Sequence, residues 1–152
     1  MSRKGKLLLL LVAAVAIGVG TAWAESPHFI SASASKACPN LVASFKIAGL
    51  GSVPSATITL SGQATATYVC INGGGQNPSA ANKETVTAPV TVSGTFPVRN
   101  GQTTGSLTLT PPGPGSFQCP PGQTLVLAMV TYQDVTVCFG TLCASLGTSS
   151  CP

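Results

Sequence analysis

Apolar and small hydroxylated side chains alternate along residues 85–98, whose sequence is TVTAPVTVSGTFPV. The even positions carry Val, Ala, Gly or Phe, and the odd positions carry Thr, Ser or Pro. Because successive side chains of a β-strand point to opposite faces, this period of two predicts a strand with one buried and one solvated face. Strands usually run to about five or six residues and proline cannot donate to a ladder, so we expect Pro89 to divide the segment into residues 85–88 and 90–98.

Further segments of the chain predict short strands by the same alternation. They are residues 29–35, 41–48, 56–60, 64–71, 106–110 and 135–139. Gly62 lies between two of them and indicates a bulge or a bend. Residues 125–132 (LVLAMVTY) are apolar at both parities. This is typical of a central strand covered on both faces, or of a strand where two layers join.

Two long segments lack periodicity and are rich in turn-forming residues. Residues 72–82 (NGGGQNPSAAN) and 111–123 (PPGPGSFQCPPGQ) are therefore expected to be loops. Loops of this length are either functional or mobile. Residues 140–152 are rich in Ser, Thr and Gly and contain Cys143 and Cys151, which predicts an irregular, bridged tail.

The pattern as a whole predicts an all-β protein. About eight short strands with turn signals at roughly 8 to 12 residue spacing are typical of an antiparallel sandwich. We expect an immunoglobulin-like β-sandwich of about 7 to 9 short strands, stapled by disulfides, in one domain over residues 25–152. A small barrel is the alternative architecture.

The first 24 residues have the composition of a secretory signal peptide. Arg3, Lys4 and Lys6 precede an apolar run at residues 7–19, and Ala22 and Ala24 supply the small residues of a cleavage site. The run falls short of the ~20 residues that span a bilayer, which disfavours the alternative of a membrane anchor. We therefore predict cleavage after Ala24 and a secreted, extracellular protein.

Cleavage changes the charge of the chain. The whole sequence has a formal net charge of +4, and three of its basic residues leave with the signal, so the mature chain carries +1. A nearly neutral chain of this kind is not expected to bind nucleic acid or, once the signal is removed, a membrane.

The chain has six cysteines, all after the signal segment: Cys38, Cys70, Cys119, Cys138, Cys143 and Cys151. In an exported chain they predict a disulfide framework, whose pairing the spacing leaves open among 15 connectivities. A metal site is the alternative. The sequence has no Cys-x-x-Cys motif and a single histidine, His28, so no metal site and no cofactor are expected.

Catalytic chemistry has few candidate residues. Glu25 lies at the expected new N-terminus, Glu84 follows Lys83, and Asp134 follows an apolar segment. A triad of His28, Asp134 and a serine is conceivable on paper, but the chain has no Gly-x-Ser-x-Gly elbow, so we expect no catalytic residues and no enzyme.

Tyrosine and threonine side chains on the predicted strands raise two possible surface chemistries. Tyr68 and Tyr132 lie on predicted strands, where a core ring with its hydroxyl at the rim is favoured over a carbohydrate platform. The pairs Thr57/Thr59, Thr65/Thr67 and Thr108/Thr110 resemble the hydroxyl ladders of ice-binding surfaces, although threonine is also simply a good strand former for a wet face.

Four segments together resemble small exported bacterial β-sandwich proteins of uncharacterised function. They are PHF at residues 27–29, ATYVC at 66–70, NPSAANK at 77–83 and PPGPGSFQCPPGQ at 111–123. The resemblance runs from about residue 27 to residue 137, and the tail with Cys138, Cys143 and Cys151 departs from the family's pattern. The resemblance implies a bridge between Cys70 and Cys119.

These expectations favour a secreted, monomeric, non-enzymatic module that binds an extracellular ligand, surface or matrix. If Cys70 and Cys119 bring the two long loops together, the loops form its recognition edge. The candidate contact residues are Asn72, Gln76, Asn77, Asn82, Phe117 and Gln118. A carrier of a small hydrophobic metabolite is the first alternative, and a small secreted hydrolase is the second.

Overall fold

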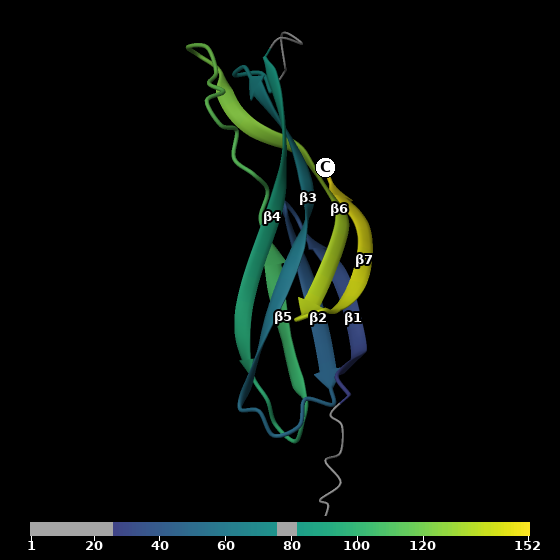
Figure 1. The fold of residues 1–152 in the computed structure, drawn as a ribbon. Coiled ribbons are helices and arrows are strands. Elements are labelled where there is room, and N and C mark those ends of the chain that lie inside the picture. Colours follow the sequence, from purple (N-terminus) through teal and green to yellow (C-terminus); the bar gives the residue numbers. More distant parts are fainter. Residues whose placement is uncertain (1–25, 76–81) are drawn as a thin grey trace, which may run out of the picture.

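The computed structural model describes residues 26–75 and 82–152, so the signal segment and the candidate residues Gln76 and Asn77 lie outside the described part. Within that part the protein is all β, which confirms the predicted class. One antiparallel sheet has the order β1-β2-β5, and the other has the order β4-β3-β6-β7 (Figure 1). The bounds are β1 His28–Ala37, β2 Asn40–Ala48, β3 Ser55–Ile71, β4 Lys83–Pro97, β5 Thr103–Leu109, β6 Thr124–Phe139 and β7 Leu142–Cys151. None of the described residues forms a helix that could span a membrane.

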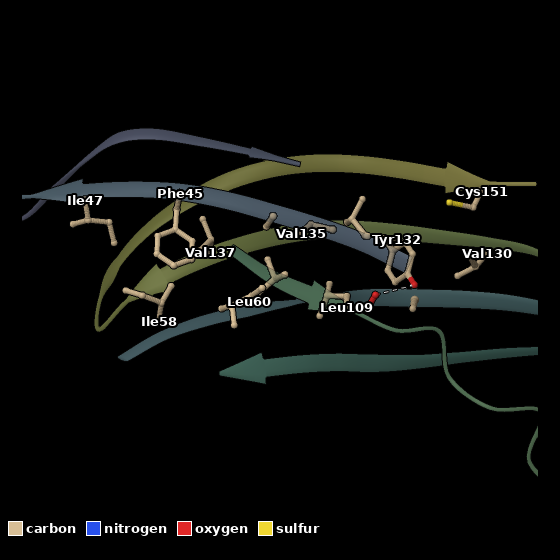
Figure 2. Packing of buried hydrophobic residues seen from close by; sticks show 14 of the residues in the cluster. Phe45, Ile47, Ile58, Leu60, Leu109, Val130, Tyr132, Val135, Val137 and Cys151 are labelled. Atoms are coloured by element: carbon tan, nitrogen blue, oxygen red, sulfur yellow. Dashed lines mark hydrogen bonds between the residues drawn. The ribbon is translucent and has the colours of Figure 1, made fainter. Parts of the chain in front are cut away.

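The two sheets bury one face of each between them. Phe45 and Ile47 of β2 pack against Ile58 and Leu60 of β3 and Val137 of β6 (Figure 2). These side chains are all 2% exposed or less. The alternation read from the sequence therefore places its apolar positions in one continuous core between two layers, as sandwich packing requires.

Three strands are much longer than the short strands that were expected. β3 has 17 residues, β6 has 16 and β4 has 15. The predicted break at Pro89 is wrong, because β4 is continuous through it. The reason is that β4 is an edge strand, where the missing N–H of a proline removes no bond from the sheet.

Gly62 lies at an irregularity of the sheet, as its sequence position indicated. The pairing of β3 with β4 runs through it unbroken, whereas the register with β6 shifts between Ser61 and Gln63. A Cβ at Gly62 would lie 3.0 Å from the carbonyl oxygen of Gln133, so the close approach of β6 favours glycine here. The bulge lets β3 continue as one strand where two were expected.

The prediction of an irregular tail is wrong. Residues Leu142–Cys151 form β7, which pairs with β6 from Phe139 to Val130. Serine, threonine and glycine are weak evidence against a strand when, as here, small residues cover a solvated sheet face. The tail is also bridged twice, by Cys138–Cys143 across the β6–β7 hairpin and by Cys38–Cys151 between the two sheets.

The four-stranded sheet extends beyond the three-stranded sheet at one end (Figure 1). Tyr132 lies opposite Ala64, and its hydroxyl reaches Pro39 at the β1–β2 turn and Leu109 at the end of β5. Strand residues beyond this level have no facing strand from the other sheet. We call this extension the arm: residues 65–71 of β3, 83–87 of β4 and 124–129 of β6.

The expectation that residues 125–132 are covered on both faces is wrong for their first half. Val130 and Tyr132 are buried, but Leu125, Val126 and Leu127 are only half-buried and Met129 is 48% exposed. The first half belongs to the arm, where the second sheet has already ended. The apolar side chains of residues 125–129 are therefore only partly buried by the described residues.

Candidate functional site

The two long loops meet at the end of the arm. Cys70 is fully buried near the end of β3 and is joined to Cys119 of the second loop with a Cα–Cα distance of 5.5 Å. This is the pairing that the family resemblance implies. The backbone N–H of Cys70 donates to the carbonyl oxygen of Asn82, 3.0 Å away. One residue thus connects the end of the first loop to the middle of the second.

Two further hydrogen bonds attach the second loop to the arm. The Asn82 side-chain amide donates to Oε1 of Gln123 at 2.9 Å, and the Tyr68 hydroxyl donates to the carbonyl oxygen of Pro112 at 2.6 Å. Together with the Cys70–Cys119 bridge, these two bonds hold the second loop, residues 111–123, near its start, in its middle and near its end. The loop therefore lies along the arm where the three-stranded sheet is missing.

The predicted contact residues take different roles. Asn72 is a turn residue, because its Oδ1 accepts from the N–H of Gly74 and its carbonyl oxygen accepts from the N–H of Gly75. Asn82 joins the loops, as described above. Phe117 is half-buried and Gln118 is exposed. Of the four candidates among the described residues, Phe117 and Gln118 are the two with no side-chain role in holding the loops, so we expect them to be the ones that meet a ligand.

Hydroxyl groups pair across the outer face of the four-stranded sheet. Between β3 and β4 the oxygen atoms lie 2.7 to 3.3 Å apart in four pairs, namely Thr57–Thr95, Thr59–Ser93, Thr65–Thr87 and Thr67–Thr85. Two more pairs, Ser61–Thr136 and Thr131–Ser150, extend the pattern to β6 and β7. The odd positions 55–67 of β3 and 85–97 of β4 include no charged residue. We call this surface the hydroxyl face.

The hydroxyl face does not form a flat lattice. The strands twist strongly along the long sheet (Figure 1), so successive hydroxyl rows turn relative to one another. Each paired hydroxyl also uses one donor or acceptor within the sheet. Cross-strand Thr and Ser pairs stabilise a sheet by about 0.2 to 1 kcal/mol each, which accounts for the rows without a ligand.

A shallow groove lies at the open side of the sandwich, where the edge strands β4 and β5 face each other. It has a volume of about 510 Å³ and is lined by Pro89, Val90, Thr91, Val92, Thr108, Leu109, Thr110, Pro111 and Pro112. Its lining combines apolar and hydroxylated side chains. The space between the sheets is filled instead by buried side chains, so the groove is a surface feature.

The titratable candidates lie on three separate elements. His28 begins β1, with its Nδ1 2.9 Å from the carbonyl oxygen of Ser26, Glu84 lies on the arm, and Asp134 lies in a bulge of β6 at φ 51°. No group of three or more His, Cys, Asp or Glu residues able to hold a metal occurs among residues 26–75 and 82–152. Over the same residues every cysteine belongs to a disulfide.

Tyr132 is a buried tyrosine whose pKa is shifted by its surroundings. Its hydroxyl donates to the carbonyl oxygen of Pro39 at 2.9 Å and lies 3.4 Å from that of Leu109 (Figure 2). Burial, with a smaller contribution from Tyr68, raises the pKa of Tyr132 to about 12. Tyr132 therefore remains protonated at neutral pH and connects the two sheets as a hydrogen-bond donor.

Sequence reasoning missed the residues that hold the loop end together. Gln123 and Pro112 lie inside a predicted loop, and nothing in their spacing shows that Asn82 and Tyr68 bind them. The sequence shows the apolar start of β6, but its unpaired edge follows only from the position at which β7 stops pairing with β6. Comparison with protein-family models, with curated proteins and with solved structures finds no match to this chain.

Proposed function

We propose that the protein is an exported, non-enzymatic binding module that recognises an extracellular surface or matrix component through the loop end of the arm. The observation that carries the proposal is the Cys70–Cys119 bridge, which attaches one long loop to the strand that leads into the other. Binding residues are often found on loops that a rigid scaffold positions. A covalent attachment also reduces the ordering entropy that a free loop would lose on binding.

Two features support an exported module of immunoglobulin-like type. Three disulfides within one small domain are compatible with an oxidising, extracellular location. The order β1-β2-β5 facing β4-β3-β6-β7 supports an immunoglobulin-like sandwich, with the difference that the fourth strand pairs with the third instead of the fifth. In such sandwiches the loops gather at the two ends, which supports recognition through the loop end of the arm.

The chemistry of the loop end favours a neutral, polar ligand. Gln118 presents an exposed amide, the amides of Asn72, Asn82 and Gln123 that hold the loops lie beside it, and prolines restrict the second loop. Lys83 and Glu84 begin β4 beside them and offset each other in charge. An amide-rich, nearly neutral surface fits hydrogen-bonding partners such as peptide or sugar groups better than a strongly charged polymer.

The test is binding to the insoluble extracellular material of the producing culture, measured by co-sedimentation, with native mass spectrometry for soluble ligands. We expect Gln118→Ala combined with Phe117→Ser to reduce the bound fraction at least about tenfold, as loss of two contacts of about 1 kcal/mol each would do. Thr65→Val combined with Thr87→Val, on the hydroxyl face, is the matched control and should bind normally. Equal loss in both double variants, or no binding by the parent protein, contradicts the proposal.

The groove between β4 and β5 is the observation that favours the alternative of a small-molecule carrier. Its volume of about 510 Å³ lies within the usual range of ligand sites, and Val90, Val92 and Leu109 supply an apolar wall. Ligand sites usually enclose most of their ligand, whereas this groove is open. A small molecule seen by native mass spectrometry that is lost from Val92→Gln and kept by the loop variant would favour the carrier.

A further inference from the structure

One stretch of β6 has an unpaired edge inside an otherwise paired sheet. β7 pairs with β6 only as far as Val130, because β7 ends at Cys151 opposite that residue. Residues 124–129 continue to pair with β3 on their other side. No described strand lies beyond Val130 on the β7 side, and Figure 1 shows β6 continuing past the end of β7. An unpaired edge presents N–H and C=O groups that can pair with another chain.

The other strand edges carry features that discourage such pairing. β4 contains Pro89 and Pro97, and β1 contains Lys36. β5 has only seven residues, and the register of β7 shifts opposite Val135. Prolines, charges, short length and bulges are the devices by which natural sheets protect their edges. Residues 124–129 (TLVLAM) have neither a charge nor a proline.

The side chains of this stretch are also apolar on both faces. Leu125 and Leu127 lie opposite Cys70 and Tyr68 on the inner face, and Val126 lies opposite Val69 on the outer face. Met129 is an exposed hydrophobic side chain, and it borders a hollow of about 220 Å³ with Leu127 and Pro152. Such composition is typical of a strand with neighbours on both sides. Among residues 26–75 and 82–152, only β3 pairs with this stretch.

We propose that a second copy of this chain pairs antiparallel with residues 124–128 through the same residues, about a two-fold axis at Val126. Side chains that lie directly opposite each other in an antiparallel pair share a face. With Val126 on the axis, Leu125 of one copy faces Leu127 of the other on the inner side, and Thr124 faces the bulge that follows Leu127. The register therefore agrees with the faces that the structure assigns to these residues.

The second copy fits this edge for two further reasons. The strand of the second copy would lie in line with β7, beyond Cys151. The second copy would leave the sheet at its own residue 123, where its loop begins, so it would not collide with β7. The two edges have no charges to repel each other, and each edge is used by the other, so the pairing closes at two copies. The two four-stranded sheets would become one continuous sheet. This dimer replaces the monomer that the sequence predicted.

A five-residue strand pair is a small interface, so the dimer is weak and reversible. We expect sedimentation equilibrium of the exported protein, with its disulfides intact, to show monomer and dimer exchanging with a Kd on the order of 10 to 100 μM. Val126→Lys or Val126→Asp places two like charges side by side on the axis. Each should weaken association at least about tenfold.

Mixing the two variants provides the decisive observation. An equimolar mixture of Val126→Lys and Val126→Asp should form a heterodimer and recover the association of the parent protein, because opposite charges then meet on the axis. Val53→Lys, at an exposed hydrophobic position in a turn outside the strands, is the matched control and should associate normally. Circular dichroism checks that every variant is folded. A parent protein that stays monomeric at about 1 mM, or a mixture that does not associate, overturns the proposal.

Discussion

The hydroxyl of Tyr132 connects three parts of the molecule, because it links β6 to the β1–β2 turn and to the end of β5. Tyr132→Phe keeps the ring but leaves the carbonyl oxygens of Pro39 and Leu109 without this donor. We expect the free energy of unfolding at pH 7 to fall by about 1 to 2 kcal/mol, measured by urea denaturation. A value unchanged from the parent protein would show that water satisfies both carbonyls equally well.

The same residue gives the protein a defined alkaline pH dependence. An unfolded tyrosine titrates near pH 10, whereas burial raises the pKa of Tyr132 to about 12 in the folded protein. The stabilising contribution of Tyr132 is therefore complete below about pH 10 and is lost as pH rises from 10 to 12, by up to about 1.4 kcal/mol per pH unit. Urea denaturation across this range should show the advantage of the parent over Tyr132→Phe shrinking. A difference that does not change with pH contradicts the assignment.

Gly105 shows how a single missing side chain permits a core contact. A Cβ at this position would collide with the ring of Phe96 and would lie 3.0 Å from Cζ of Phe45. The two rings meet edge to face with their centroids 5.0 Å apart. Gly105→Ala should therefore displace Phe96 and lower the free energy of unfolding by about 1 to 3 kcal/mol. Gly113→Ala, which meets nothing within 4 Å, is the control and should change stability by less than about 0.5 kcal/mol.

At the scale of elements, side-chain alternation predicted which residues face the core better than it predicted where strands end. The even positions of β3 and β4 face inward as expected, because the period of two is a property of each strand. Strand length depends on neighbours: Pro89 is tolerated because β4 lies at an edge, and Gly62 is tolerated because the bulge involves β6 alone. Those neighbours are set by the tertiary fold and could not be read from either segment by itself.

The arm and its covering loop should depend on one bridge. Cys70–Cys119 spans a sequence separation of 49, for which loop-closure entropy gives about 4 kcal/mol. Replacing both cysteines with alanine should lower stability by a large part of that amount. It should also speed hydrogen exchange in residues 65–71 and 83–87 more than in the core of β2. Cys138→Ala with Cys143→Ala, which opens a separation of 5, is the matched control and should leave exchange in the arm unchanged. Similar exchange in the two double variants would mean that Cys119 does not secure the loop.

At the scale of the whole molecule, the sequence predicted two layers and a disulfide framework. It did not predict which of the remaining four cysteines pair with each other. Cys38 lies in the turn between β1 and β2, and Cys151 ends a strand that was expected to be irregular. Their proximity follows from the contact of β1 with β7 at one side of the sandwich. The candidate recognition residues show the same limit, since the sequence indicated the loops but not the Asn82–Gln123 and Tyr68–Pro112 bonds that position them.

The Cys38–Cys151 bridge is expected to contribute most to the stability of the whole molecule. It connects the first sheet to the last strand across a sequence separation of 113, for which loop-closure entropy gives about 5 kcal/mol, against about 2 kcal/mol for Cys138–Cys143. Cys151 is also 1% exposed and belongs to the core, so its replacement removes packing as well. Cys38→Ala with Cys151→Ala should therefore give the lowest melting temperature of the three double variants, followed by the pair at Cys70 and Cys119. Calorimetry of the three double variants gives the order directly, and a lowest melting temperature for the Cys138 and Cys143 pair would show that local strand pairing outweighs loop closure in this fold.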